Sequence, residues 1–290
     1  MRVTQSGLWS LVRSNLRQTN SRMREVEERA VSGMVVNRAS DAPALLGQID
    51  RLQGAKLDQA VYETNASQAM AQLDQLDSTL GTIHDQLTRA RELAVQASSD
   101  LSNAEQRGYI AQEIESIRET VLQSANADFA GRYLFAGTNW DTPPYDDTGT
   151  YAGSTDVPSV RVGDGVWVQT ARDGSEVFDG DVDIFGALDD FITALESDDS
   201  TGIAGSLDTL DSALDQVMSA RADVGNDARV AEDAGSLADS LSTEIESRLD
   251  TLLSADPAET YTQLSELRTA YETALQVASS SKGKSLFDLI

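Results

Sequence analysis

The fold is decided by residues 73–101, which read LDQLDSTLGTIHDQLTRARELAVQASSDL. Apolar residues recur there at alternating intervals of three and four through four heptads, and they are Leu73, Leu76, Leu80, Ile83, Leu87, Ala90, Ala94, Ala97 and Leu101. This alternation is typical of a helix that presents one narrow apolar stripe to a partner helix. The stretch therefore predicts a long helix in a helical bundle or a coiled coil, between which the spacing does not distinguish.

The same spacing returns on both sides of this stretch, in residues 9–30, 110–121, 203–217 and 264–278. Signals for helix starts separate these segments. They are Asp41 close before Pro43, a capping-box pattern that begins near Asn103, and Asp256 directly before Pro257. We therefore expect helices over residues 8–31, 43–100, 104–129, 184–197, 203–254 and 257–281.

The middle of the chain has a different pattern. Residues 160–162 and 166–170 alternate apolar and polar side chains around a Gly-Asp-Gly turn, which predicts a β-hairpin. A second turn at residues 172–175 leads to Val177 and Phe178, which we read as a further short β segment. Residues 136–202 carry 15 acids and two bases, a net charge of −13, so we expect a solvated exterior that discourages lateral aggregation.

Together these patterns predict a mainly α protein, an elongated helical bundle or coiled-coil rod built from N- and C-terminal arms with a small β-rich inserted domain. The expected parts are an N-terminal inner coiled-coil arm (1–42), the N-terminal half of the helical rod (43–130), an acidic outer insertion (131–202), the C-terminal half of the rod (203–256) and a C-terminal inner arm (257–290).

Composition excludes several classes of function. The 290 residues carry a formal net charge of −26, which opposes binding to nucleic acids and to anionic membrane surfaces. There is no cysteine and only one histidine, so disulfides, thiolate metal sites and most catalytic triads are excluded. No run of 18 apolar residues predicts a membrane span, and the N-terminus lacks the apolar region of a cleaved secretory signal.

The remaining candidate chemistry is weak. His84 lies next to the apolar stripe with no nucleophile at helical spacing, so we interpret it as a partly exposed polar residue. Asp179, Asp181 and Asp183 imitate half of a calcium loop, but Ile184 occupies the position that needs glycine. We therefore expect Asp183 to cap a helix that begins at Ile184. No catalytic, cofactor-binding or metal-binding residue is expected, and the protein is not expected to be an enzyme.

Both ends of the chain carry helical stripes that we expect to serve assembly. Each stripe is narrow, and ordering the backbone costs about 1–2 kcal/mol per residue, so we expect both ends to be flexible in the isolated subunit and to fold on a partner. The candidate assembly residues are Trp9, Val12, Leu16, Met23, Val26, Leu264, Leu267, Tyr271, Leu275, Leu286, Phe287, Leu289 and Ile290.

Several motifs resemble the bacterial flagellin family. The segment SGMVVNRASDAP at residues 32–43 is similar to the N-terminal flagellin motif, although Ala42 stands where two acids usually precede the proline. The matching motif residues are Ser32, Gly33, Asn37, Ala39, Asp41 and Pro43. Residues 89–98, 221–226 and 285–290 are also similar to the family. The segment GRYLFAGTNWDTPPY at residues 131–145 resembles the branch of the family found at the hook–filament junction.

This resemblance implies a structural subunit of the bacterial flagellum that joins hook to filament by helical, polymer-type packing of its terminal arms. It implies as partners neighbouring copies, another hook-associated protein, flagellin and an export chaperone, and no cofactor. It also implies secretion through the flagellar type III apparatus without a cleaved signal peptide. A short filament flagellin is the near alternative, and a helical-rod signalling protein or adhesin is the alternative from another class.

Overall fold

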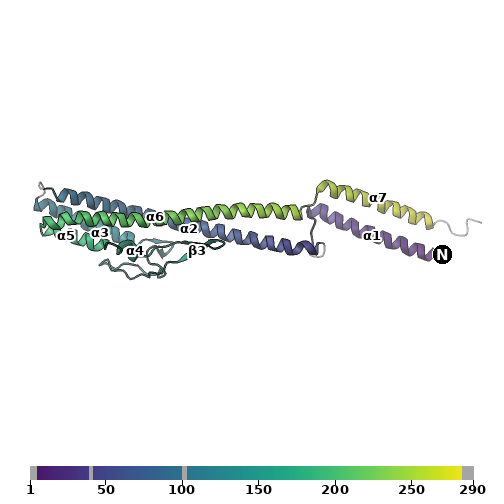
Figure 1. Ribbon diagram of the computed structural model, residues 1–290. Coiled ribbons are helices and arrows are strands. Elements are labelled where there is room, and N and C mark those ends of the chain that lie inside the picture. The colour runs from purple at the N-terminus through teal and green to yellow at the C-terminus, as the bar shows by residue number, and fades with distance from the viewer. Residues whose placement is uncertain (1–4, 39–41, 100–102, 283–290) are drawn as a thin grey trace, which may run out of the picture. The chain divides into compact units, whose positions relative to one another are not determined.

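The computed structural model describes residues 5–38, 42–99 and 103–282, and within them the chain is mainly α with small β segments (Figure 1). The helices are α1 (Gln5–Ser32), α2 (Pro43–Ala97), α3 (Ala104–Ala125), α4 (Gly174–Phe178), α5 (Ile184–Glu196), α6 (Ser200–Leu253) and α7 (Pro257–Lys282). The strands are β1 (Asp128–Phe129), β2 (Arg132–Tyr133), β3 (Ser159–Gly163) and β4 (Val166–Gln169).

The chain forms two compact units. One unit, here called the central unit, comprises residues 58–241. The other, here called the arm unit, comprises residues 1–57 and 242–290. The boundaries fall inside α2 and α6, whereas the sequence places its divisions between helices; the five-part division of the chain stays a prediction.

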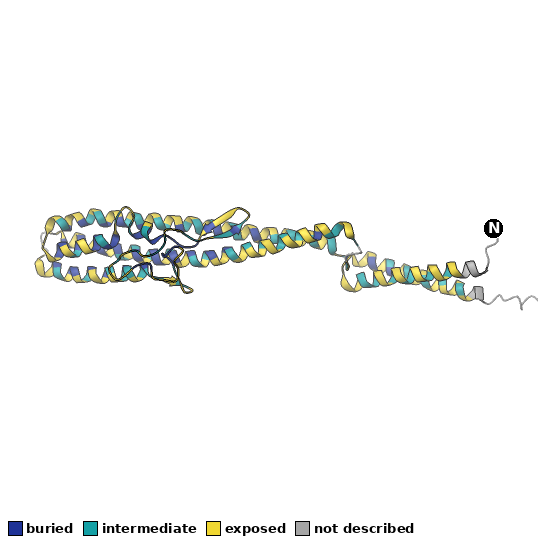
Figure 2. Cartoon of the chain, turned by 90° about the horizontal axis from the view of Figure 1, so that it is seen from below, coloured by how far each residue is buried: buried dark blue, intermediate teal, exposed yellow. Residues whose placement is uncertain are grey.

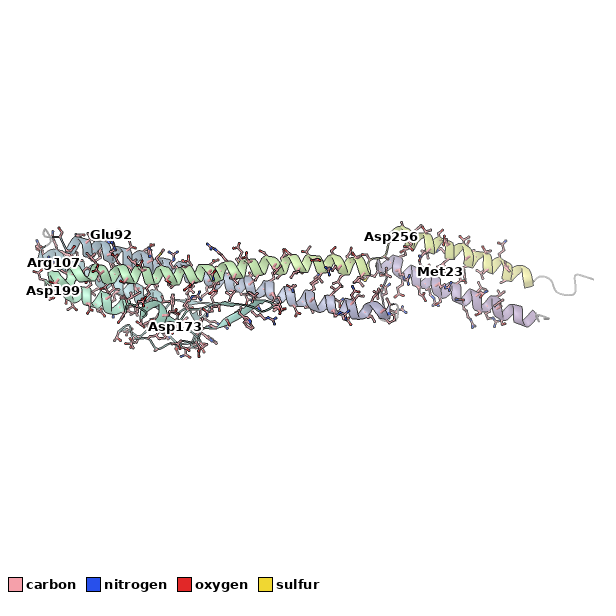
Figure 3. The ribbon with its side chains drawn as sticks, viewed as in Figure 1. Met23, Glu92, Arg107, Asp173, Asp199 and Asp256 are labelled. Carbon is pink, nitrogen blue, oxygen red and sulfur yellow. The ribbon has the colours of Figure 1, made fainter. Side chains whose placement is uncertain are left out.

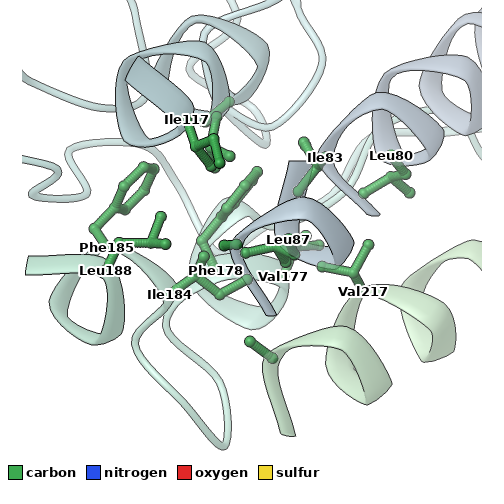
Figure 4. Packing of buried hydrophobic residues seen from close by; sticks show 14 of the residues in the cluster. Leu80, Ile83, Leu87, Ile117, Val177, Phe178, Ile184, Phe185, Leu188 and Val217 are labelled. Atoms are coloured by element: carbon green, nitrogen blue, oxygen red, sulfur yellow. The ribbon is translucent and has the colours of Figure 1, made fainter. Parts of the chain in front are cut away.

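The core of the central unit is built on the stripe that the sequence marks in α2. Leu73, Leu76, Leu80, Ile83 and Leu87 are fully buried. Figure 4 shows Leu80, Ile83 and Leu87 close to side chains of α3, α4, α5 and α6. In this part of the molecule the buried residues line the inner faces of the helices, and the outer faces are exposed (Figure 2). The stripe therefore faces several helices at once, as in a bundle.

Small residues let α2 and α6 approach closely. A Cβ atom on Gly235 of α6 would lie 3.3 Å from the Cβ of Ala66 on α2. The Arg221 guanidinium of α6 donates to both carboxylate oxygens of Asp77 on α2, at 3.0 and 3.2 Å. This half-exposed pair fixes the register of the two helices more than it stabilises them, because exposed pairs contribute only about 0.2–1 kcal/mol.

The segment between α3 and α6 contains two hairpins and two helices. The β3–β4 hairpin turns at residues 163–166, which confirms the alternating pattern and its turn. The reading of residues 172–178 as a turn followed by β structure is wrong, because Gly174–Phe178 is the helix α4. Asp173 caps this helix by accepting hydrogen bonds from the Ser175 N–H and hydroxyl, at 2.9 and 2.7 Å. An N-cap aspartate is equally common in turns, which explains the error.

An aromatic cluster forms the core of this segment. Tyr145 contacts Tyr151, Phe178 and Phe185 with ring centroids 5.2–5.3 Å apart, and Phe135 meets Phe178 edge to face at 5.2 Å. Edge-on and tilted rings are favourable geometries. The segment at residues 131–145 therefore supplies two of the rings that hold the insertion together.

Gly137 in the same segment is required by a close backbone approach. Its φ is +59°, and a Cβ atom there would lie 2.0 Å from the Ser154 carbonyl oxygen. A side chain at this position would push the two loop strands apart, so the Ala136–Gly137 turn fixes how this loop folds back on itself.

Helix ends follow their capping residues. Asn103 accepts from the Gln106 N–H at 2.9 Å while the Gln106 side chain accepts from the Asn103 N–H at 3.1 Å, which confirms the capping box. The Asp183 side chain accepts from the Gly186 N–H at 2.9 Å, as expected for a cap. Two expected ends are wrong: α2 ends at Ala97 rather than at residue 100, and α3 ends at Ala125 because residues 128–133 form the β1–β2 hairpin.

In the arm unit α1 and α7 lie side by side and run in opposite directions (Figure 1). Val26 of α1 and Leu264 of α7 are buried, and Arg268 donates to Glu27 at 3.3 Å. Within the chain, each terminal stripe therefore faces the other. Whether the pair stays ordered in the isolated subunit remains a prediction.

Candidate assembly surface

The candidate assembly residues are split between covered and open positions on the α1–α7 pair. Val26 and Leu264 are buried, whereas Val12, Leu16, Met23, Leu267 and Tyr271 are half-buried. Leu275 is 45% exposed. Figure 3 labels Met23 on α1 and Asp256 at the start of α7. The side chain of Trp9 and the residues Leu286, Phe287, Leu289 and Ile290 lie outside what the structure describes.

An open groove runs between α1 and α7 where their small residues meet. Its volume is about 710 Å³, and its walls include Val12 on α1 and Ala270, Ala274 and Val277 on α7. The alanines leave space that larger side chains would fill, so the apolar seam is not closed on this side. A two-helix pair covers only one face of each helix, which leaves the groove open to a further helix.

Exposed apolar side chains that the stripe analysis did not select surround this pair. They are Leu11, Val31, Met34, Tyr261 and Val277, and Val31 is 90% exposed. They lie off the three-four stripe, so a search for one seam passes over them. No second apolar face in the sequence marks them either, because the residues on the same face of α1 as Leu11 are polar, such as Ser14, Gln18 and Arg22.

The motif at residues 32–43 forms a clasp with the end of α6. The Val35 N–H donates to the Leu253 carbonyl at 2.7 Å, and the Ala255 N–H donates to the Gly33 carbonyl at 2.8 Å. These bonds flank an antiparallel bridge between Met34 and Ser254. The clasp, residues 33–35 with 253–255, therefore ties the connection between α1 and α2 to the connection between α6 and α7.

Motif residues shape this clasp locally. Gly33 has a φ of +69°, the conformation that commonly ends a helix, and its N–H donates to the Arg29 carbonyl at 2.8 Å. The Ser32 hydroxyl accepts from the Met34 N–H at 3.1 Å, and the Asn37 amide donates to the Met34 carbonyl at 3.3 Å. Pro43 begins α2, whereas Ala39 and Asp41 lie outside the described residues.

Of the other positions considered in the sequence, Asp179 and Asp183 make structural hydrogen bonds. His84 is half-buried on α2. The Asp179 carboxylate accepts from the Tyr145 hydroxyl at 3.3 Å. Burial, followed by the charges of Asp183 and Asp173, raises the pKa of Asp179. Within the described ranges there is no group of three His, Cys, Asp or Glu residues that could hold a metal ion, and no helix that is long and apolar enough to cross a membrane.

Comparisons with known proteins agree with the motifs. Residues 6–140 match the model of the bacterial flagellin N-terminal helical region. Flagellar hook-associated protein 3 of Escherichia coli strain K12 is 25% identical to this chain over 300 residues, which cover 93% of this chain and 94% of the relative. The chain is therefore similar to the bacterial flagellin family over residues 6–140 and to hook-associated protein 3 over nearly its whole length. The resemblance drawn from the motifs is thereby confirmed, and the family is one of flagellar structural proteins.

Within the family, hook-associated relatives match more of this chain than the flagellins do. Flagellin FlaB1 of Treponema pallidum is 26% identical, but the match covers 71% of this chain and 70% of the relative. The fold agrees with a putative flagellar hook-associated protein from Vibrio parahaemolyticus, with a TM-score of 0.68 at 20% identity over 74% of this chain and all of that one. A flagellar hook-associated protein 3 from Legionella pneumophila gives a TM-score of 0.63 at 16% identity, over 70% of this chain and 98% of that one.

Proposed function

We propose that this chain is the structural subunit that joins the flagellar hook to the filament, and that the α1–α7 pair makes the joining contacts. The observation that carries the proposal is the open apolar groove between these helices, together with the exposed apolar residues around it. A monomer gains nothing from apolar side chains in water, whereas an assembly can bury them between copies.

The energy available from such burial is large enough for assembly. Fully burying a leucine or valine side chain contributes roughly 1.5–3 kcal/mol, and each 1.4 kcal/mol is a tenfold change in affinity. Leu11 and Leu275 are 57% and 45% exposed, so both retain much of this contribution for contacts with another chain. We include Leu286, Phe287, Leu289 and Ile290 in the same proposal, since the sequence there is strongly apolar.

The proposed partners follow from this position in the flagellum. They are neighbouring copies of this chain, another hook-associated protein and flagellin. We further propose export through the flagellar type III apparatus with the help of a chaperone, since the relatives are flagellar hook-associated proteins. The acidic insertion, with its exposed carboxylates, would face outward as a solvated exterior.

Substitutions on the open face of the arms test the proposal. Val277→Asp places a charge on the wall of the groove where the proposed partner helix packs, and Leu11→Asp places one on the exposed apolar surface of α1. We expect the helical circular dichroism and the melting temperature to change little, while filament attachment and motility are lost. Val166→Asp is the matched control, because Val166 is 37% exposed on the β3–β4 hairpin. Normal motility of both arm variants would contradict the proposal.

A filament flagellin is the second candidate, since flagellins also match this chain. Deleting the chain from its organism separates the two functions. A junction subunit would leave hooks intact while filament subunits accumulate in the medium, whereas a filament subunit would itself be missing from the medium. The same deletion strain serves as host for the arm variants.

A further inference from the structure

The charge of this protein is confined to one of its two units. The central unit, residues 58–241, contains 35 acids, nine arginines and no lysine, a net charge of −26. The arm unit contains 13 acids and 13 bases and is neutral. The whole net charge of the chain therefore lies on the central unit, and the unit proposed to make the assembly contacts carries none.

The arginines of the central unit are used mainly as links between elements. Six of them donate to a carboxylate on another element, in the pairs Arg89–Glu113, Arg91–Asp211, Arg107–Asp198, Arg118–Asp189, Arg172–Asp227 and Arg221–Asp77. Arg161 pairs with Asp164 inside its own hairpin. Figure 3 labels Arg107 on α3. Arg89 also pairs with Glu92. Together, the ion pairs among the described residues of this unit use eight of its 35 acids.

The unpaired carboxylates repel one another over the whole surface of the unit. Examples on one helix are Asp215, Glu232 and Asp239, all exposed on α6. The Debye length is about 30 Å at 0.01 M salt and about 3 Å at 1 M, so at low salt each charge repels those within several helical turns and at high salt only its immediate neighbours. A large net charge destabilises a compact state through this repulsion. Exposed ion pairs contribute little each, so the repulsion outweighs them.

The types of charged residue in the central unit are also typical of a strongly hydrated, negatively charged surface. Of the 35 acids in the central unit, 26 are aspartate, whose short side chain brings a hydrated carboxylate to the surface with little added apolar area. Lysine, with its long apolar stem, is absent from this unit. The described carboxylates do not gather into a three-residue metal site, so a diffuse layer of cations fits them better than a bound ion.

We infer that the central unit depends on a screening layer of monovalent cations for its folded stability, and that this protein is suited to a medium of high ionic strength. The arm unit, being neutral, has no such dependence. The inference does not rest on the proposed flagellar role, because it concerns the folding of one unit of the free chain.

Thermal unfolding of the full chain at different salt concentrations tests this inference. Trp140 and Trp167 lie in the central unit, and a Trp9→Phe background makes their fluorescence report on that unit alone. We expect its melting temperature to rise by about 10 °C or more between 0.01 and 1 M NaCl, and equally in KCl. A constant or falling melting temperature would mean that ion pairs outweigh the repulsion, and it would overturn the inference.

Two matched triple variants separate screening from a general salt effect on apolar burial. Asp215→Asn, Glu232→Gln and Asp239→Asn together remove three exposed charges from the central unit. Glu259→Gln, Glu266→Gln and Glu272→Gln together remove three from α7, where the unit is neutral. The first variant should melt higher at low salt and respond less to added salt, and the second should match the parent. Equal salt responses in all three proteins would overturn the inference.

Discussion

Asp179 is a single side chain whose ionised form destabilises the folded state. Its carboxylate accepts from the buried Tyr145 hydroxyl, but it also lies near Asp183 and Asp173 with no base among its contacts. Burial and these two charges raise its pKa, so the folded state prefers the protonated acid. Protonated Asp179 therefore stabilises the folded state at low pH. This contribution is lost as the pH rises through the raised pKa of Asp179.

The variant Asp179→Asn should consequently stabilise the protein at neutral pH. Its amide oxygen can still accept from the Tyr145 hydroxyl, while the charge is gone. We expect a higher melting temperature at pH 7, and the gain should vanish near pH 3, where the parent carboxyl is protonated as well. Thermal melts across this range check it. Asp181→Asn, an exposed neighbour, is the control, and an equal gain at both positions and at every pH would contradict the explanation.

At the scale of elements, the clasp joins two connections through Met34 and Ser254, which are 220 residues apart along the chain. The bridge between Met34 and Ser254 is flanked by hydrogen bonds from Val35 to Leu253 and from Ala255 to Gly33. This pattern defines a non-hydrogen-bonded antiparallel pair, in which Cα atoms lie about 4.5 Å apart and side chains share one face. Such a separation falls within the range that a disulfide can span.

The double variant Met34→Cys with Ser254→Cys should therefore form a disulfide readily under mild oxidation. The chain has no other cysteine, so no competing pair exists. Non-reducing electrophoresis and thiol titration measure the cross-link, and the oxidised protein should resist cleavage at the start of α7. In the control pair, Val35→Cys with Ser254→Cys, residue 35 points to the opposite face, and oxidation should be slow. Equal oxidation of both pairs would show that the clasp is not formed in solution.

At the scale of the whole molecule, apolar burial is very unequal between the two units. Of the buried hydrophobic residues in the described parts of the chain, the arm unit holds only four, Val26, Val36, Ile49 and Leu264. The remaining forty, including Phe135, Tyr145, Phe178 and Phe185 of the aromatic cluster, lie in the central unit. Ordering the backbone costs about 1–2 kcal/mol per residue, so α1 and α7 are only weakly held by their own contacts.

Limited proteolysis should therefore remove the arms first. Trypsin is expected to cut at Arg13, Arg17 or Arg22 in α1 well before it cuts at Arg89 or Arg221 in the central unit. The early product should keep its helical signal and its melting transition. Mass spectrometry of timed digests identifies the cuts. Cleavage that proceeds at similar rates in both units would contradict the unequal burial as the cause.

The sequence by itself determined the features that depend on neighbouring residues. The three-four stripe of α2, the caps at Asn103 and Asp183, and the β3–β4 hairpin were all predictable, because one turn or one heptad contains the residues that cause them. The motifs at residues 32–43 and 131–145 also sufficed to indicate the flagellin family. The role of each candidate assembly residue stays a prediction.

Only the tertiary structure decided the features that join distant residues. The pairing of α1 with α7, the clasp between residues 33–35 and 253–255, and the ring cluster around Tyr145 each need partners that local periodicity does not name. The helix α4 was missed for the same reason, since five residues are too few for a helical period and its buried Val177 and Phe178 are held by the core. Short elements take their structure from packing because their own hydrogen bonds cannot offset the cost of ordering the chain.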